Sequence, residues 1–308
     1  MESIASSNTN GASVSYSYDE LGRLSTVVDN RLGGTTSYSY DNASNVATVA
    51  YPNNFQSSFT YDSLNRLTSL VTPVSGYNYT LGATGNRTQA VELNHNRVVN
   101  WSYDGINRLT GEAINSDEAK NSGSVSYSLD PVGNRSSAVS SLGTLSSGSW
   151  SYNADDEVSS ETYDDNGNVL LTGGKTFTYD SENHMTSMTG NGSVVTMAYD
   201  AFGNRVAKTV NGVTTRYLIE DDVNPTGLPQ VLEETVGGAV QRVYTYGLQR
   251  ISQNQIINNA WTVSFYGYDG MGNVRQLTNS AGVVTDEYEY DAYGNSFTKR
   301  TCSAVFVL

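Results

Sequence analysis

Aromatic and small polar residues alternate along short segments of this chain, and the alternation recurs about every 21 residues. Segment 14–18, Val-Ser-Tyr-Ser-Tyr, is typical, because its two rings stand two positions apart with a serine between them. Period-two alternation places both rings on one face of a β-strand and the hydroxyl on the other. The first ring position is aromatic in ten of the twelve copies, with Glu161 and Met197 as the exceptions; the rings are Tyr16, Tyr38, Phe59, Tyr79, Trp101, Tyr127, Trp150, Phe177, Tyr266 and Tyr288.

A turn signal follows each of these predicted strands. The second ring position is followed by an acidic residue, two variable residues and a glycine or asparagine. Glycine and asparagine accept positive φ, so this spacing predicts a type I turn that closes a β-hairpin with a bulge. The second ring positions are Tyr18, Tyr40, Tyr61, Leu81, Tyr103, Leu129, Tyr152, Tyr163, Tyr179, Tyr199, Tyr268 and Tyr290.

The acidic residues are interpreted as turn formers. A carboxylate at the first turn position can accept hydrogen bonds from the backbone of its own turn. Arginine follows many turns, as at Arg23 and Arg87, and we expect it to pack on a tyrosine and neutralise a turn aspartate. The turn aspartates are Asp19, Asp41, Asp62, Asp104, Asp130, Asp164, Asp180, Asp200, Asp269 and Asp291, with Gly82 and Asn153 as the exceptions.

These repeats predict an all-β protein. No segment has a convincing helical period, and Asn211-Gly212 adds a further hairpin signal between Val210 and Val213. Twelve hairpins correspond to about 24 strands, and an open twisted sheet rarely exceeds ~10 strands without curling. The predicted fold is therefore an array of β-hairpins that coils as a spiralling sheet.

Composition excludes several classes of function. The net charge of −14 disfavours nucleic acid and anionic membranes as partners. The single cysteine, Cys302, excludes an internal disulfide framework, and no run of 18 apolar residues predicts a membrane span. Segment 1–15 is polar and lacks the apolar core of a signal peptide.

Few residues are candidates for chemistry. The only histidines are His95 and His184, and His184 stands at a turn position, while Cys302 lies in a tail that departs from the repeat. Segment 164–168, Asp-Asp-Asn-Gly-Asn, weakly resembles a calcium loop but lacks the required glutamate, so a turn explains it better. We therefore expect no catalytic, cofactor-binding or metal-binding residues, no cofactor and no enzyme activity.

The repeated Tyr-Asp-x-x-Gly-Asn/Arg phrase resembles the YD repeats of bacterial Rhs and wall-associated proteins, of the B and C components of insecticidal Tc toxins, and of teneurins. The resemblance extends from about Val14 to Asn295. Segments 216–231, 244–248 and 266–277 resemble the stretch that enters the Rhs-associated core. In that family the repeats form a hollow shell around a C-terminal payload, which an aspartyl self-cleavage site releases.

The resemblance also implies a division of the chain. We expect a disordered or truncated start at 1–13, a repeat array at 14–210, repeats leading into the Rhs-associated core at 211–297, and an aberrant truncated tail at 298–308. The family's conserved core and toxin domain are not matched, so no cleavage aspartate is carried over.

Two functions remain open. The resemblance implies a structural shell segment that encapsulates or presents a C-terminal effector or toxin, in secretion or contact-dependent competition. The alternative is a cell-surface module that binds carbohydrate or protein through its aromatic rows. Expected partners are the chain's own effector domain, secretion-system or cell-surface components, and carbohydrate, but not nucleic acid. The full-length protein is expected to be secreted or at the cell surface.

Overall fold

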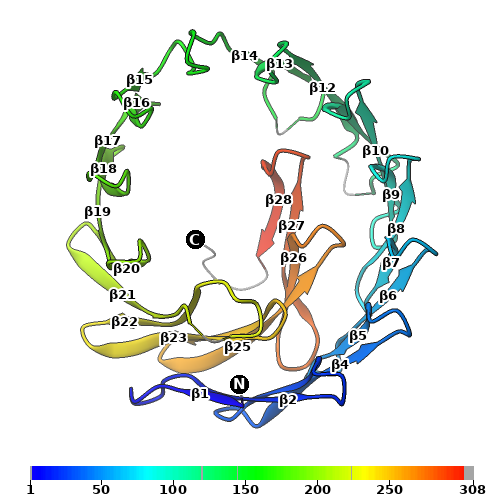
Figure 1. Ribbon diagram of the computed structural model, residues 1–308, viewed down its shortest axis with the longest axis vertical. Helices are drawn as coiled ribbons and strands as arrows, with labels where there is room; N and C mark the ends of the chain where they lie inside the picture. Colours follow the sequence, from blue (N-terminus) through cyan, green and yellow to red (C-terminus); the bar gives the residue numbers. More distant parts are fainter. Residues whose placement is uncertain (1, 119–120, 144, 223, 302–308) are drawn as a thin grey trace. The chain divides into compact units, whose positions relative to one another are not determined.

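A computed structural model describes residues 2–118, 121–143, 145–222 and 224–301. Within these ranges the protein consists of β-strands and turns without a helix, which confirms the all-β prediction. The strands follow one another in chain order (Figure 1). Each pairs with its sequence neighbours in one of two fourteen-stranded sheets, β1–β14 and β15–β28, and every pairing is antiparallel where the register is given.

The first sheet comprises β1 (Ser3–Ala5), β2 (Ser13–Tyr18), β3 (Leu24–Asp29), β4 (Gly34–Tyr40), β5 (Val46–Ala50), β6 (Gln56–Tyr61), β7 (Leu67–Val71), β8 (Gly76–Leu81), β9 (Arg87–Glu92), β10 (Arg97–Tyr103), β11 (Leu109–Asn115), β12 (Gly123–Leu129), β13 (Arg135–Ser140) and β14 (Gly148–Ser149).

The second sheet comprises β15 (Thr162–Tyr163), β16 (Val169–Thr172), β17 (Lys175–Tyr179), β18 (Met185–Gly190), β19 (Ser193–Tyr199), β20 (Arg205–Val210), β21 (Val213–Glu220), β22 (Gln230–Val236), β23 (Ala239–Tyr246), β24 (Arg250–Ile257), β25 (Ala260–Tyr268), β26 (Val274–Thr278), β27 (Val284–Tyr290) and β28 (Ser296–Thr301).

The repeat turns have the predicted geometry. In the first, Gly22 N–H donates to Asp19 O and Asp19 N–H donates to Arg23 O, both at 2.9 Å. A bulge shifts the strand register between Ser17 and Tyr18. The fourth turn position has positive φ in all twelve copies, at Gly22, Ser44, Asn65, Gly85, Asn107, Gly133, Asp156, Gly167, Asn183, Gly203, Gly272 and Gly294.

The aspartate carboxylates act as predicted. Asp19 Oδ1 accepts hydrogen bonds from the backbone N–H groups of Leu21 and Arg23, at 3.0 and 2.9 Å. Arginine has two separate roles rather than one. At the fifth turn position Arg23 pairs with Asp19 Oδ2 at 2.7 Å, whereas one position later Arg87 lies over the Tyr79 ring, 4.7 Å from its centroid.

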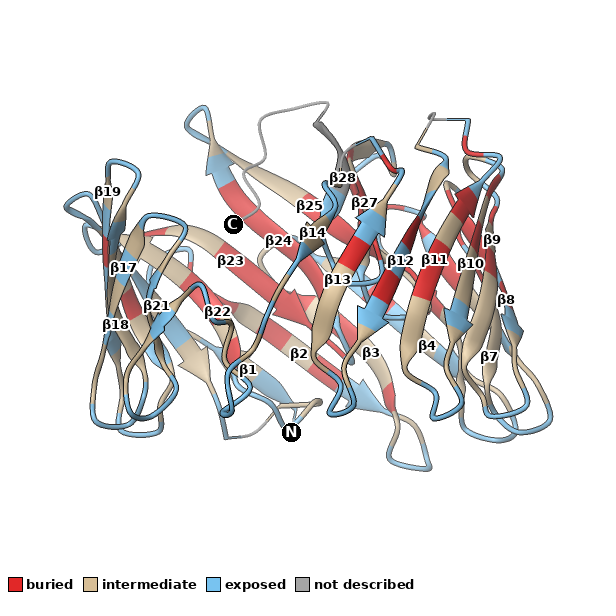
Figure 2. Cartoon of the chain, turned by 90° about the horizontal axis from the view of Figure 1, so that it is seen from above, coloured by how far each residue is buried: buried red, intermediate tan, exposed pale blue. Residues whose placement is uncertain are grey.

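The strand faces also alternate as predicted. Tyr16 is buried and Ser17 is exposed, and the same difference separates Tyr127 from Ser128. Tyr18 is an exception, because it is 39% exposed whereas the other second rings are at least half-buried. Figure 2 shows buried positions in the middle of the strands and exposed residues at the turns. The rings therefore serve mainly as sheet packing.

The array is weakest between β14 and β15. The copy at Tyr152 forms its turn, but its strands are reduced to an isolated bridge between Tyr152 and Val158. The preceding segment 140–149 is rich in serine and glycine. Such residues offer little apolar surface to bury, so the strand pairing there has little support.

By contacts, the chain divides into two compact units, each built from two segments: 1–33 with 150–263, and 34–149 with 264–308. In the first unit Leu232, Val240, Val243, Tyr244 and Tyr246 pack with Ala12. In the second, Leu70, Tyr77, Tyr79 and Ala90 form a buried cluster. The predicted boundaries at 210, 211 and 297 rest on the repeat pattern and remain predictions.

Part of the predicted disordered start is ordered. Ser3–Ala5 forms β1 and pairs with β2. The backbone N–H of Ala12 donates to Glu233 Oε1 at 2.6 Å, and Asn8 Nδ2 donates to Glu233 Oε2 at 2.7 Å. Glu233 is fully buried, so these bonds also satisfy its carboxylate. The short strand and this buried acceptor could not be recognised from a repeat pattern that begins at Val14.

Candidate functional site

Of the candidates from the sequence, His184 and segment 164–168 lie in ordinary turns, whereas His95 lies in a turn that contacts β27. His184 N–H donates to Asp180 Oδ1 at 2.9 Å, and the His184 ring stacks on Tyr199 with centroids 4.7 Å apart. Asp164 Oδ1 accepts the N–H groups of Asn166 and Asn168, as in the other turns. Both assignments to turns are confirmed. Cys302 lies outside the residues that the structure describes.

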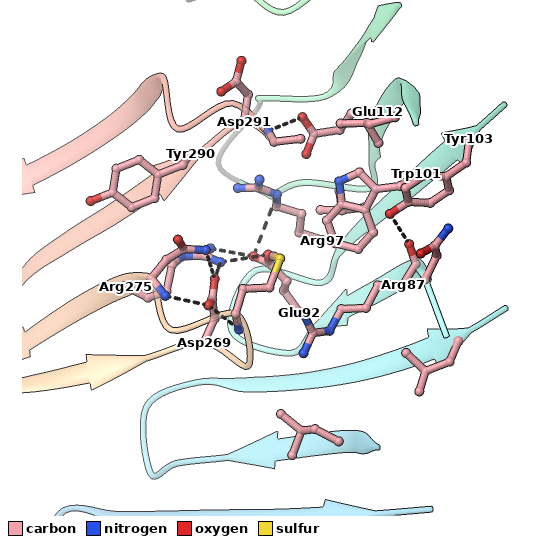
Figure 3. Close-up of a pocket in the computed structure, with 18 of the residues that line it drawn as sticks. Arg87, Glu92, Arg97, Trp101, Tyr103, Glu112, Asp269, Arg275, Tyr290 and Asp291 are labelled. Carbon is pink, nitrogen blue, oxygen red and sulfur yellow. Dashed lines mark hydrogen bonds and ion pairs between the residues drawn. The ribbon is translucent and has the colours of Figure 1, made fainter. Parts of the chain in front are cut away.

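A cavity of about 550 Å³ lies within the second unit (Figure 3). One side is formed by strands and turns of segment 66–112, and the other by segment 269–292. Figure 3 shows Glu92, Arg97, Glu112, Asp269 and Arg275 directed toward this space. Two segments far apart in the sequence therefore meet around a set of charged side chains.

Arg275, on β26, is the central cation of this set. Its two terminal nitrogens bind the two oxygens of Glu92 on β9, at 3.1 and 2.9 Å, in a bidentate pair. The same guanidinium lies 3.4 Å from Asp269 Oδ2 and 5.2 Å from the centroid of the Tyr77 ring. Arg275 Nε donates to Tyr288 O at 2.9 Å. A planar fork suits such a pair better than an ammonium group does.

Burial and pairing compete at Glu92. Burial by itself raises the pKa of this carboxyl, but Arg275, Arg97 and His95 outweigh it and hold the pKa below its ordinary value. Glu92 is only 4% exposed, and it stays ionised because these cations surround it. Removing one partner of such a pair leaves an uncompensated buried charge.

A second group of charges lies beside the first. Arg97 NH1, on β10, lies 3.1 Å from Glu289 Oε2 on β27. His95 Nδ1 lies 3.0 Å from Glu289 Oε1, and its Nε2 lies 3.5 Å from Glu287 Oε1. Asn121 Nδ2 donates to Glu289 Oε2 at 3.0 Å. These contacts also connect segment 95–121 to β27.

Glu112 has the most perturbed carboxyl of the cavity. It lies on β11, is 4% exposed, and its Oε2 accepts the backbone N–H of Ala292 at 2.9 Å. Burial raises the pKa of Glu112 to about 7; the hydrogen bond from Ala292 opposes this rise, and the nearby charge of Asp291 adds to it. Glu112 is therefore poised between its two protonation states near neutral pH.

The chemistry of the arrangement is that of a connection. Glu92, Asp269 and Glu289 are engaged by arginine, and Asp269 also accepts Asn273 N–H in its turn. We name the set of Glu92, Arg97, Asp269, Arg275 and Glu289 the ionic latch. Since each of its carboxylates pairs with an arginine, the ionic latch holds segment 269–289 against β9 and β10.

The repeat pattern does not predict the ionic latch, because Arg275 is an exception to that pattern. Position 275 follows the first apolar residue after a turn, where Ser25, Thr68 and Thr110 stand in other repeats. An arginine there breaks the repeat pattern, and this exception was the signal in the sequence for the ionic latch.

Across the described residues, no helix has the length and apolar character needed to cross a lipid bilayer.

Comparison with known proteins agrees with this fold. Residues 2–110 match the teneurin YD-shell family. The tRNA nuclease WapA of Bacillus subtilis (strain 168) is 32% identical over 115 residues, which are 36% of this chain and 5% of the relative. The tRNA3(Ser)-specific nuclease WapA of Bacillus spizizenii is 32% identical over 117 residues, again 36% of this chain and 5% of the relative. The chain thus spans about one twentieth of the curated relatives that it matches.

Solved structures extend the likeness of fold to nearly the whole chain. The crystal structure of TcdB2-TccC3 covers 95% of this chain with a TM-score of 0.70 and 14% identity, over 19% of its own length. The Photorhabdus luminescens Tc holotoxin pore covers 95% with a TM-score of 0.68 and 14% identity, over 18% of its own length. About the first third of the chain therefore matches the teneurin YD-shell family, and nearly all of the chain shares the fold of these Tc toxin structures.

Proposed function

We propose that this chain is a structural segment of a YD-repeat shell that encapsulates or presents a C-terminal effector or toxin, in secretion or contact-dependent competition. The observation that carries the proposal is the uniform turn, with positive φ at the same position in all twelve copies. One structural unit repeated this regularly builds a wall rather than a single pocket. The likeness of fold to TcdB2-TccC3 over 95% of the chain supports it.

The ionic latch supports a structural role as well. Each of its carboxylates is engaged by an arginine, whereas a catalytic acid or base needs a group that can exchange a proton with a substrate. On this proposal the chain is not itself an enzyme. Its partner is an effector domain, and the full-length protein acts outside the producing cell or at its surface, with secretion-system or cell-surface components as further partners.

One observation favours the alternative, a surface module that binds protein or carbohydrate. The third turn position carries exposed apolar side chains, with Phe202 86% and Val132 73% exposed. Leu21, Leu64 and Ile106 occupy the same position of their turns and are exposed too. Such a recurring apolar position is the kind of feature that binds a partner. The aromatic rows favour glycan binding less, because most of their rings are at least half-buried.

A protection experiment separates the two functions. A small nuclease domain is attached after Leu308 or before Met1, and each fusion is digested with a protease that cleaves the free domain quickly. Encapsulation predicts that the domain after Leu308 is cleaved at least ten times more slowly than the domain before Met1. Equal rates, together with saturable binding of the untreated chain to cells or glycans, would favour the adhesion module.

A further inference from the structure

Three candidate metal ligands converge in the second unit. Among the described residues, the ligand atoms of His95, Asp117 and Glu289 all lie within 4.8 Å of one another. His95 lies in the turn between β9 and β10, Asp117 follows β11, and Glu289 lies on β27. Glu289 is 1% exposed and Asp117 is 7% exposed. Three separate parts of the chain thus direct nitrogen and oxygen donors into one buried place.

The carboxylate of Glu289 is oriented by its neighbours. Its Oε2 faces Arg97 and Asn121, at 3.1 and 3.0 Å. Its Oε1 faces His95 Nδ1 at 3.0 Å. One oxygen is therefore held by protein donors, and the other is directed at the imidazole.

Both nitrogens of His95 face carboxylates. Nδ1 lies near Glu289 Oε1, and Nε2 lies 3.5 Å from Glu287 Oε1, which accepts Asn94 Nδ2 at 3.3 Å. A neutral imidazole has one N–H and one lone pair. If Nε2–H points to Glu287, the lone pair of Nδ1 faces another carboxylate, which is unfavourable unless a cation lies between them or the ring carries a second proton.

We propose that His95 Nδ1, Asp117 and Glu289 bind a divalent transition-metal ion, with Zn²⁺ as the best fit. Imidazole and carboxylate are both zinc ligands, whereas Ca²⁺ and Mg²⁺ prefer oxygen alone. Nε2–H then donates to Glu287, which gives the carboxylate–histidine–metal arrangement that fixes the tautomer of a ligand. Three protein ligands leave a fourth position for water.

Charge favours the ion too. Asp117, Glu287 and Glu289 lie around His95. Arg97 pairs with Glu289, but its Nε also lies 3.8 Å from Glu92 Oε2, so its charge is shared between two carboxylates. A dication offsets the excess negative charge. It also links residues 95 and 289, which are 194 positions apart, so it acts as a clip beside the ionic latch.

The test is a zinc titration of the complete chain, free of affinity tags and stripped of metal, by calorimetry and elemental analysis. We expect one equivalent of Zn²⁺ to bind with a dissociation constant at or below about 1 μM. At a free Zn²⁺ concentration one hundred times that constant, the melting temperature of the protein should rise by about 5 °C or more. His95→Gln and Asp117→Asn should weaken binding at least thirtyfold, and the matched control His184→Gln, at the other histidine, should leave it unchanged.

Two results would overturn the proposal. One is less than 0.2 equivalents of zinc bound by the unaltered chain at 100 μM zinc. The other is zinc binding that survives His95→Gln and Asp117→Asn. If His95→Gln does not fold, as a thermal melt would show, the smaller change Asp117→Asn decides the question.

Discussion

At the scale of single residues, two features of the repeat favour its turns. The aspartate carboxylate accepts backbone N–H groups, as Asp62 Oδ1 does from Leu64 and Arg66 at 2.9 and 3.0 Å. Three residues later the backbone takes positive φ, which favours glycine and asparagine. The carboxylate satisfies donors that this backbone conformation leaves free, although the turn that begins at Gly82 forms with the same positive φ without a carboxylate.

The first prediction concerns glycine at that position. Gly203 has φ +81°, and a Cβ there would lie 3.0 Å from His184 Nε2. Gly22 has φ +74° with nothing within 4 Å of such a Cβ. Valine at either position should lower the free energy of unfolding by about 1–3 kcal/mol, more at Gly203. Gly22→Asn should cost less than half as much, and urea denaturation would measure all three. Equal losses for valine and asparagine at Gly22 would contradict the backbone explanation.

A second prediction uses the raised pKa of Glu112. Between the ordinary glutamate pKa near 4.3 and about 7, the native protein binds more protons than the unfolded chain. Stability must therefore fall as the pH rises through this window. Glu112→Gln removes this contribution, so the difference in free energy of unfolding between the original and the variant should change by on the order of 2–3 kcal/mol between pH 4.5 and 8. A pH-independent difference in denaturation midpoints would show that Glu112 is solvated.

At the scale of elements, identical hairpins acquire different roles through a few substitutions. Arg275 replaces a small polar residue on β26 and pairs with Glu92 on β9. The next hairpin, β27–β28, places Tyr293 edge-on against Tyr127 at 4.6 Å, with Arg135 over the Tyr293 ring at 4.2 Å. In β26–β28 the turns pack against strands of the same unit, whereas many other turns remain exposed.

The prediction at this scale concerns the ionic latch. Arg275→Met should lower the free energy of unfolding by about 3–5 kcal/mol, because it leaves Glu92 buried without its bidentate partner. The double variant Arg275→Met with Glu92→Leu should recover much of that loss. The matched control is Arg23→Met, which breaks a partly exposed pair with Asp19 and should cost about 1 kcal/mol or less. Additive losses in the double variant would mean that the pair contributes no coupling energy.

At the scale of the whole molecule, the array leaves strands with a single neighbour. In the strand order these are β1 and β14 of one sheet, and β15 and β28 of the other. A strand at a sheet edge presents backbone N–H and C=O groups that can pair with another chain. β14 and β15 are only two residues long, which limits such pairing, whereas β1 has three residues and β28 has six.

We predict that the isolated 308-residue chain associates through these edges. Light scattering should give a mass above that of one chain, and it should rise with protein concentration. Lysines at the exposed positions Ser3 and Ala5 of β1 should reduce the association, because charged edges resist pairing. A stable, monodisperse monomer would argue against an open shell segment and favour a self-contained binding module.

The sequence alone determined what is local. Turn type, bulge, strand alternation and the all-β class followed from residues within a few positions of one another, because backbone preference and period-two burial are short-range effects. Even Ser44 and Asp156, which are neither glycine nor asparagine, adopt the predicted positive φ. The expectations of no enzyme activity and no metal site remain untested. The proposed zinc site is at odds with the expectation of no metal site.

The tertiary structure alone decided what meets across long separations. Glu92 with Arg275, His95 with Glu289, and Ala12 with Glu233 are pairs separated by 183, 194 and 221 residues. Charged residues at such positions look like ordinary turn or surface residues until the strands are placed side by side. Repetition is the physical reason, because each hairpin carries nearly the same local signal and that signal does not specify which distant hairpin it contacts.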